Sequence, residues 1–154
     1  MACSSPYKIL TCEKSALQLA VQREGLVWNP GCRLPWRKRS CLGKNIRWDE
    51  RTPALLLLDP GKTYAVQYTL RVCVKSSAGG EGLILLQQPP CGAFADTSPL
   101  RISMERLSRC PQTLRYAAVL RPRADGGQEA ELSLVWEGKS PLCVERAAMD
   151  VTEL

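Results

Sequence analysis

Eight cysteines are the residues of this 154-residue chain that could most readily do chemistry. An even number of thiols in a short chain favours an oxidising compartment, in which structural disulfides persist. Cys3 with Cys12 and Cys32 with Cys41 share the spacing C-x8-C, which suits local loop closure. The alternative is a set of buried, reduced thiols, and the sequence does not choose the pairing. All eight are disulfide candidates: Cys3, Cys12, Cys32, Cys41, Cys73, Cys91, Cys110 and Cys143.

Histidine is absent from the chain. This removes the commonest general base and the commonest metal ligand. No C-x-x-C pair, Gly-rich phosphate loop or G-x-S-x-G motif is present, and these are the usual signatures of zinc sites, nucleotide sites and serine hydrolases. The sequence therefore predicts a protein that is not an enzyme and has no cofactor or metal.

The formal net charge is +6, and the densest cationic run is RLPWRKRS, with Trp36, Arg37, Lys38 and Arg39 in a predicted loop from Cys32 to Lys44. Such a run could contact an acidic protein or a heparin-type polyanion, or simply be a solvated loop. Exposed Trp and Arg are enriched at interface hot spots, whereas the alternative for Trp36 is packing beneath its own loop. Nucleic acid is not expected, because the strands show no base-stacking pattern.

Short apolar or alternating stretches between Gly/Pro turns predict about eight to ten strands and no helix. In the longest stretch, Tyr64 to Val72, every second side chain is apolar, so we expect one face to be buried and the other to be exposed. The stretch Leu83 to Leu86 is predicted to be its hairpin partner. The other predicted strands cover residues 16–21, 26–28, 46–48, 55–58, 100–104, 113–120, 130–136 and 146–154.

This pattern predicts an all-β fold, a two-sheet β-sandwich of jelly-roll topology. A single domain is expected over residues 1–154, with residues 1–13 as an N-terminal extension. Since no apolar run reaches the roughly 20 residues that cross a bilayer, the chain as given is expected to be soluble.

The order of the segments resembles the homology domain of the tumour necrosis factor (TNF) ligand superfamily. The segments are ALQL, LVWN, NIRWDE, the alternating run PGKTYAVQYTLRV, LRYAAVL and the closing RAAMDVTEL. The irregular loops and cysteines look most similar to the CD30 ligand and CD70 branch. C1q-like and bacterial spore-surface jelly rolls share the architecture and are the competing resemblance.

The resemblance implies the soluble ectodomain of an extracellular cytokine ligand, secreted or shed from a membrane, that binds a cysteine-rich receptor and signals by clustering it. A homotrimer is implied, with Tyr116, Ala117 and Gln67 as candidate interface residues; the alternative for Tyr116 is an ordinary core position. Loops at strand ends would supply receptor contacts, and the candidates are Trp36, Arg37, Lys38, Arg39 and Arg109. The alternative function is a non-signalling adhesion or structural head of the C1q or spore-surface type.

Overall fold

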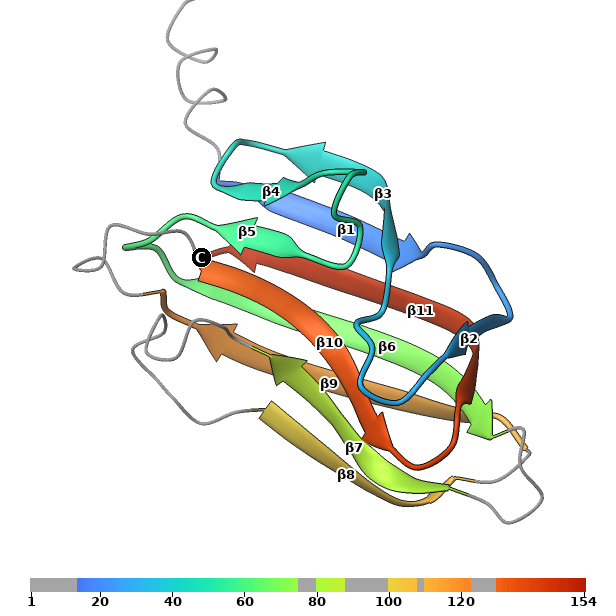
Figure 1. Cartoon of the computed structure of the whole chain (residues 1–154). Helices are drawn as coiled ribbons and strands as arrows, with labels where there is room; N and C mark the ends of the chain where they lie inside the picture. Colours follow the sequence, from blue (N-terminus) through green and yellow to red (C-terminus); the bar gives the residue numbers. More distant parts are fainter. Residues whose placement is uncertain (1–13, 75–79, 88–99, 108–109, 123–129) are drawn as a thin grey trace, which may run out of the picture.

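The strands of the protein form two layers that face each other across one core (Figure 1). A computed structural model describes residues 14–74, 80–87, 100–107, 110–122 and 130–154, with the backbone alone for 80–87 and 100–107. The strands are β1 (Ala16–Val21), β2 (Leu26–Trp28), β3 (Trp36–Leu42), β4 (Ile46–Trp48), β5 (Leu56–Leu58), β6 (Tyr64–Val74), β7 (Gly80–Gln87), β8 (Leu100–Leu107), β9 (Gln112–Leu120), β10 (Ala130–Gly138) and β11 (Leu142–Glu153).

The two layers are antiparallel sheets built from segments far apart in sequence. The first sheet has the strand order β3-β1-β11-β6-β9, with the short β2 pairing with β11, and the second has the order β4-β5-β10-β7-β8. The predicted all-β, two-sheet fold is confirmed. Its first and last described strands, β1 and β11, lie side by side in the middle of the first sheet.

The inner faces of both sheets form the core, as period-2 alternation requires. On β6, Tyr64, Val66, Tyr68 and Leu70 are at most 2% exposed, which confirms the face predicted from the alternating pattern. Three tryptophans, Trp28, Trp36 and Trp136, are also almost fully buried. The first sheet therefore presents one apolar face to the core and a second, largely polar face to the outside.

Two predictions about the strands are wrong. The predicted loop from Cys32 to Lys44 contains β3, which pairs with β1 at the edge of the first sheet. The predicted hairpin of Leu83–Leu86 with the long strand does not form, because β6 pairs with β11 and β9 while β7 pairs with β10 and β8 in the opposite sheet. The chain therefore passes from the first sheet to the second between β6 and β7.

A buried carboxylate ties the end of β11 to the beginning of β1. Glu153 accepts hydrogen bonds at Oε1 from the Ser15 backbone N–H (3.2 Å) and from Asn45 Nδ2 (2.8 Å). The Asn45 backbone N–H donates in turn to Ser15 Oγ (2.9 Å). The Asn45 hydrogen bond, helped by the Ser15 backbone and by Lys62 and Lys14, holds the pKa of Glu153 below its ordinary value against the opposing effect of burial.

Replacing Glu153 with alanine is expected to lower the free energy of unfolding at pH 7 by about 1–3 kcal/mol, because two donors lose their acceptor. A carboxylate whose folded pKa is depressed stabilises the protein above its unfolded pKa of about 4.3, and this contribution is lost as the pH falls through the folded value. The difference in unfolding free energy between wild type and Glu153→Ala, measured by urea unfolding, should therefore shrink from pH 7 to pH 3. A difference that stays constant with pH would contradict the assignment, and Glu137→Ala, at an exposed carboxylate on β10, is the control.

Candidate functional site

The outer face of the first sheet is organised in rows, because the strand register places side chains from five strands opposite one another. The row nearest the beginning of β6 joins Leu42, Ala16, Thr152, Ala65 and Val119. We call it the apolar row. Leu42 is 50% exposed and Val119 52% exposed, so this monomer leaves two large apolar side chains in water at opposite ends of the row.

The next row is polar and contains two of the predicted interface residues. It joins Ser40, Gln18, Asp150, Gln67 and Ala117, and Ser40 Oγ donates to Gln18 Oε1 (2.9 Å). Gln67 and Ala117 are direct register partners, and both are exposed. The structure thus brings these two predicted residues together on a face that is open in the monomer.

Tyr116, the third predicted interface residue, points the other way. It is the register partner of the buried Tyr68, and the two ring centroids are 5.7 Å apart. It is partly buried against the core, whereas its neighbour Ala117 is exposed. The prediction that Tyr116 faces a neighbouring copy is therefore wrong, because the pleat of β9 turns its ring to the core side.

The outer face becomes basic toward the other end of the sheet, where a hollow of about 650 Å³ opens. Small side chains, including Ala20, Ala148 and Thr69, form part of its lining. The charged residues of its lining come from three strands, β3, β6 and β11, and from the turn after β1, and we call this hollow the arginine groove. The charged residues are Arg23, Arg37, Arg39, Arg71, Arg146, Glu24 and Glu145.

Two register shifts bring extra charged residues to this groove. On β1, Gln18 pairs with Ser40 of β3 and the next residue, Leu19, pairs with Lys38. Arg39 of β3 is therefore left without a partner on β1. On β11, Val144 and Arg146 pair with consecutive residues of β6. Glu145, which lies between them, therefore has no partner on β6. Each shift is a β-bulge, which places two residues of one strand opposite one residue of the other and re-aims a side chain.

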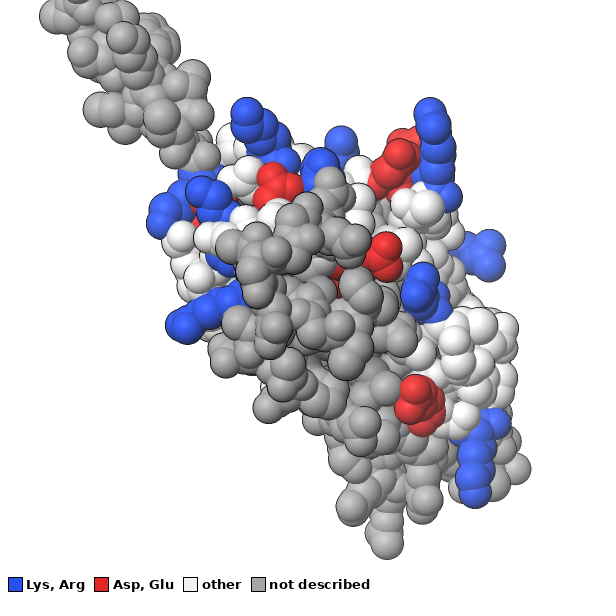
Figure 2. Space-filling model, turned by 60° about the vertical axis from the view of Figure 1, so that its left-hand side comes forward, with Lys and Arg blue, Asp and Glu red and all other residues white. Residues whose placement is uncertain are grey.

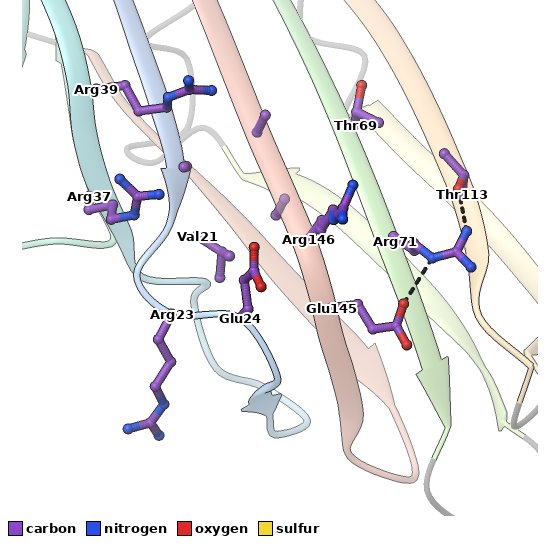
Figure 3. Close-up of a pocket in the computed structure, with 13 residues that line it drawn as sticks. Val21, Arg23, Glu24, Arg37, Arg39, Thr69, Arg71, Thr113, Glu145 and Arg146 are labelled. Atoms are coloured by element: carbon purple, nitrogen blue, oxygen red, sulfur yellow. Dashed lines mark hydrogen bonds and ion pairs between the residues drawn. The ribbon is translucent and has the colours of Figure 1, made fainter.

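The two walls of the groove differ in their charge pairing. Arg71 Nε donates to Glu145 Oε2 (2.8 Å) and Arg71 Nη1 to Thr113 Oγ1 (3.3 Å), so this arginine is held in place (Figure 3). Arg37 and Arg39 stand on β3 at the opposite side, and Arg23 extends away from the other arginines. Within the described part of the chain, Arg37, Arg39 and Arg146 form no ion pair.

A second hollow, of about 660 Å³, lies on the other side of β3. Trp48, Leu55 and Leu57 contribute its partly buried apolar surface. Its charged rim includes Lys38, and we call it the tryptophan hollow. The indole N–H of Trp48 donates to the Pro53 carbonyl (3.0 Å), which fixes the ring. The cationic run RKR is therefore divided, with Arg37 and Arg39 at the arginine groove and Lys38 at the tryptophan hollow.

The prediction that Trp36 is an exposed anchor is wrong. Trp36 begins β3, faces Val21 across the β1–β3 ladder, and is 0% exposed within the core cluster. Alternation along β3 sends this ring inward and the following arginine outward. Arg37, Lys38 and Arg39 are exposed, as predicted, and Arg109 lies outside the described residues.

The cysteines form no disulfide within the described residues. The predicted closure of Cys32 with Cys41 is absent, because both thiols are free and exposed and β3 occupies most of the segment between them. Cys73 and Cys143 are register partners on β6 and β11, and both are half-buried. Cys110 is exposed, and Cys3, Cys12 and Cys91 lie outside the described residues.

The surface in Figure 2 shows Lys and Arg interspersed with Asp and Glu rather than gathered in one block. Among the described residues, no group of three or more Cys, Asp or Glu is placed to hold a metal ion. The same residues contain no helix long and apolar enough to cross a membrane. The two hollows and the two rows of the outer face are the features that a partner could recognise.

No protein-family model and no curated protein matches the chain by sequence. Solved structures match it by fold. The TNF protein Eiger from S. frugiperda has a TM-score of 0.62 at 11% identity, with 92% of each chain covered. Murine APRIL has a TM-score of 0.57 at 9% identity, covering 92% of this chain and 100% of its own. The globular domain of zebrafish complement 1qA protein has a TM-score of 0.57 at 15% identity, covering 92% and 97%. These neighbours show the TNF/C1q-like jelly roll, and they do not favour the CD30 ligand and CD70 branch.

Proposed function

We propose that the protein is the extracellular domain of a TNF-like ligand, which self-associates through the outer face of its first sheet and clusters a cysteine-rich receptor. The observation that carries the proposal is the fold match to the TNF protein Eiger, at a TM-score of 0.62 over 92% of both chains. A ligand of this kind acts by binding and not by catalysis, in keeping with the lack of histidine.

The apolar row supports self-association. Leu42 and Val119 stand at its two ends, each at least 50% exposed, with the small Ala16 and Ala65 between them. Small side chains let a second copy approach closely, and Leu42 and Val119 would lose contact with water on association. Gln67 and Ala117, in the next row, would extend this surface. The self-association surface proposed here is more polar than a surface made of aromatic side chains.

The tryptophan hollow supports receptor binding. An apolar floor with a charged rim is the usual anatomy of an interface centre, and a Trp held by its own hydrogen bond loses little entropy on binding. The hollow lies beyond β3, on the side away from the arginine groove, and its lining does not include any residue of the apolar row. A receptor could therefore bind there while copies associate through the sheet face.

Changing Val119 to aspartate is expected to dissociate the assembly, since a charge would be buried against apolar neighbours. Light scattering coupled to size-exclusion chromatography measures the mass, and surface binding to a panel of cells that display cysteine-rich receptor ectodomains measures recognition. Loss of multivalency should weaken cell binding by about 100-fold or more. Val27→Asp is the matched control, because Val27 is 40% exposed but lies on β2, outside the row.

A wild-type protein that is monomeric at micromolar concentration contradicts self-association through the row. Association without binding to any receptor of the panel favours the alternative, a non-signalling C1q-type head, which the fold match to zebrafish complement 1qA also supports.

A further inference from the structure

The arginine groove carries positive charge that the protein does not itself neutralise. Arg71 is paired with Glu145 at 2.8 Å, whereas Arg37, Arg39 and Arg146 form no ion pair in the described residues. Five arginines and two glutamates line the hollow, which leaves an excess of three positive charges, and an anion placed among the unpaired guanidinium groups would relieve their mutual repulsion.

The shape of the groove suits a ligand that lies across the sheet. Its volume of about 650 Å³ falls within the range of small-molecule sites. Between the arginine-bearing strands the face is lowered by Ala20, Ala148 and Thr69, which are register partners in one row. Arg37 on β3 and Arg146 on β11 are separated by β1, which sets them about 10 Å apart along the sheet.

The two bulges are a second observation that marks this region. Arg39 and Glu145 are the unpaired residues of the bulges on β3 and β11, and both line the groove. Bulges interrupt the ladder and are concentrated where a strand must re-aim a side chain for a site. One bulge adds a cation to the β3 wall, and the other supplies the carboxylate that orients Arg71.

The charges favour an anionic occupant over a second copy of the chain. Two such grooves facing each other would bring like charges together, which is destabilising. The lining contains no aromatic side chain, so the stacking that single-stranded nucleic acid requires is missing. Guanidinium groups bind sulfate-type oxygens through paired N–H donors.

We propose that the arginine groove binds a sulfated glycan, with Arg37, Arg39 and Arg146 contacting sulfate groups on neighbouring sugars and Arg71 forming the fixed wall. The groove shares the outer face of the first sheet with the proposed self-association surface, but it lies at the opposite end of that face, and no residue of the apolar row or of the tryptophan hollow lines it. Sulfated glycans would hold the protein at cell surfaces or in the matrix whether or not it clusters a receptor.

The test is calorimetric titration with a heparin hexasaccharide, together with elution from immobilised heparin by salt. The double variant Arg37→Glu/Arg146→Glu is expected to bind the hexasaccharide at least about tenfold more weakly. The slope of log affinity against log salt should also become less steep by about two. Lys44→Glu/Lys62→Glu makes the same change in net charge at exposed positions beyond the opposite end of the sheet, and it should bind like wild type.

Thermal unfolding of both double variants checks that each is folded. Equal weakening by the two variants would overturn the proposal, since overall charge would then explain the binding. Undiminished binding of a desulfated hexasaccharide, or equal competition by single-stranded DNA, would overturn it too. If Arg37→Glu/Arg146→Glu changes the mass of the glycan-free protein but leaves its glycan affinity unaltered, the proposal is overturned and the groove is a contact with a second copy of the chain.

Discussion

Replacing Trp36 with alanine is expected to lower the free energy of unfolding by about 3–5 kcal/mol, the usual loss for a buried aromatic side chain. The ring is 0% exposed and belongs to the core cluster, so its removal leaves a cavity between the sheets. The midpoint of urea unfolding measures this loss directly. Such a loss is a large share of the stability of an ordinary domain.

The conservative variant Trp36→Phe is the matched control. It keeps an aromatic ring and removes the indole N–H, for which the described residues supply no hydrogen-bond partner. Because a buried, unsatisfied donor is itself costly, this variant should lose less than half of what Trp36→Ala loses. Wild-type stability in Trp36→Ala together with lost partner binding would contradict the buried position and restore the anchor hypothesis.

Replacing Gly43 with alanine is expected to destabilise the protein through two separate effects. Gly43 has φ +75°, in the left-handed region that costs an L-residue about 1–2 kcal/mol. A Cβ at this position would also collide with the Ser15 side chain and lie 2.9 Å from Ser15 Cα. Ser15 Oγ is the acceptor for Asn45 and cannot move freely, so the collision should add about 1–3 kcal/mol.

Gly25→Ala separates the two effects. Gly25 has φ +78°, and a Cβ there would meet nothing within 4 Å. Gly25→Ala and Gly43→Ala both place alanine at a positive φ and both change the unfolded chain in the same way. The difference in unfolding free energy between the two variants therefore measures the collision alone. Equal losses would show that Ser15 moves aside and that its hydrogen bonds with Asn45 and Glu153 do not hold it in place.

Alternation and turn residues predicted most of the strands, and β1, β2 and β4 have the predicted bounds. β3 was missed because only Trp36, the first of its seven residues, is buried. Charged side chains on an exposed edge strand protect it against aggregation. Such a strand lacks the alternation of apolar and polar residues by which strands are predicted from sequence. The hairpin partner of β6 was wrong because alternation specifies which face is buried, and does not specify the neighbouring strand.

The candidate site was predicted only in part. Gln67 and Ala117 lie on the outer face, and their place in an interface stays a prediction. Tyr116 was assigned to the interface from its position in the resemblance, although alternation along β9 already groups it with Leu114, Ala118 and Leu120 on the apolar face. The arginine groove was missed altogether. It depends on strand order, which brings Arg37 and Arg146 to one hollow, and on two bulges, and a sequence marks neither of these in advance.

The pairing of β1 with β11 has a consequence for how the molecule is made. Residues 16–20 form their ladder with residues 148–152, so loop closure over most of the chain must precede it, and such topologies fold slowly. During synthesis, the edges of β1 and β6 that pair with β11 have no partner until β11 has left the ribosome. Unpaired strand edges of this kind promote aggregation. A chain truncated before β11 should therefore accumulate as aggregate, although every other described strand is present.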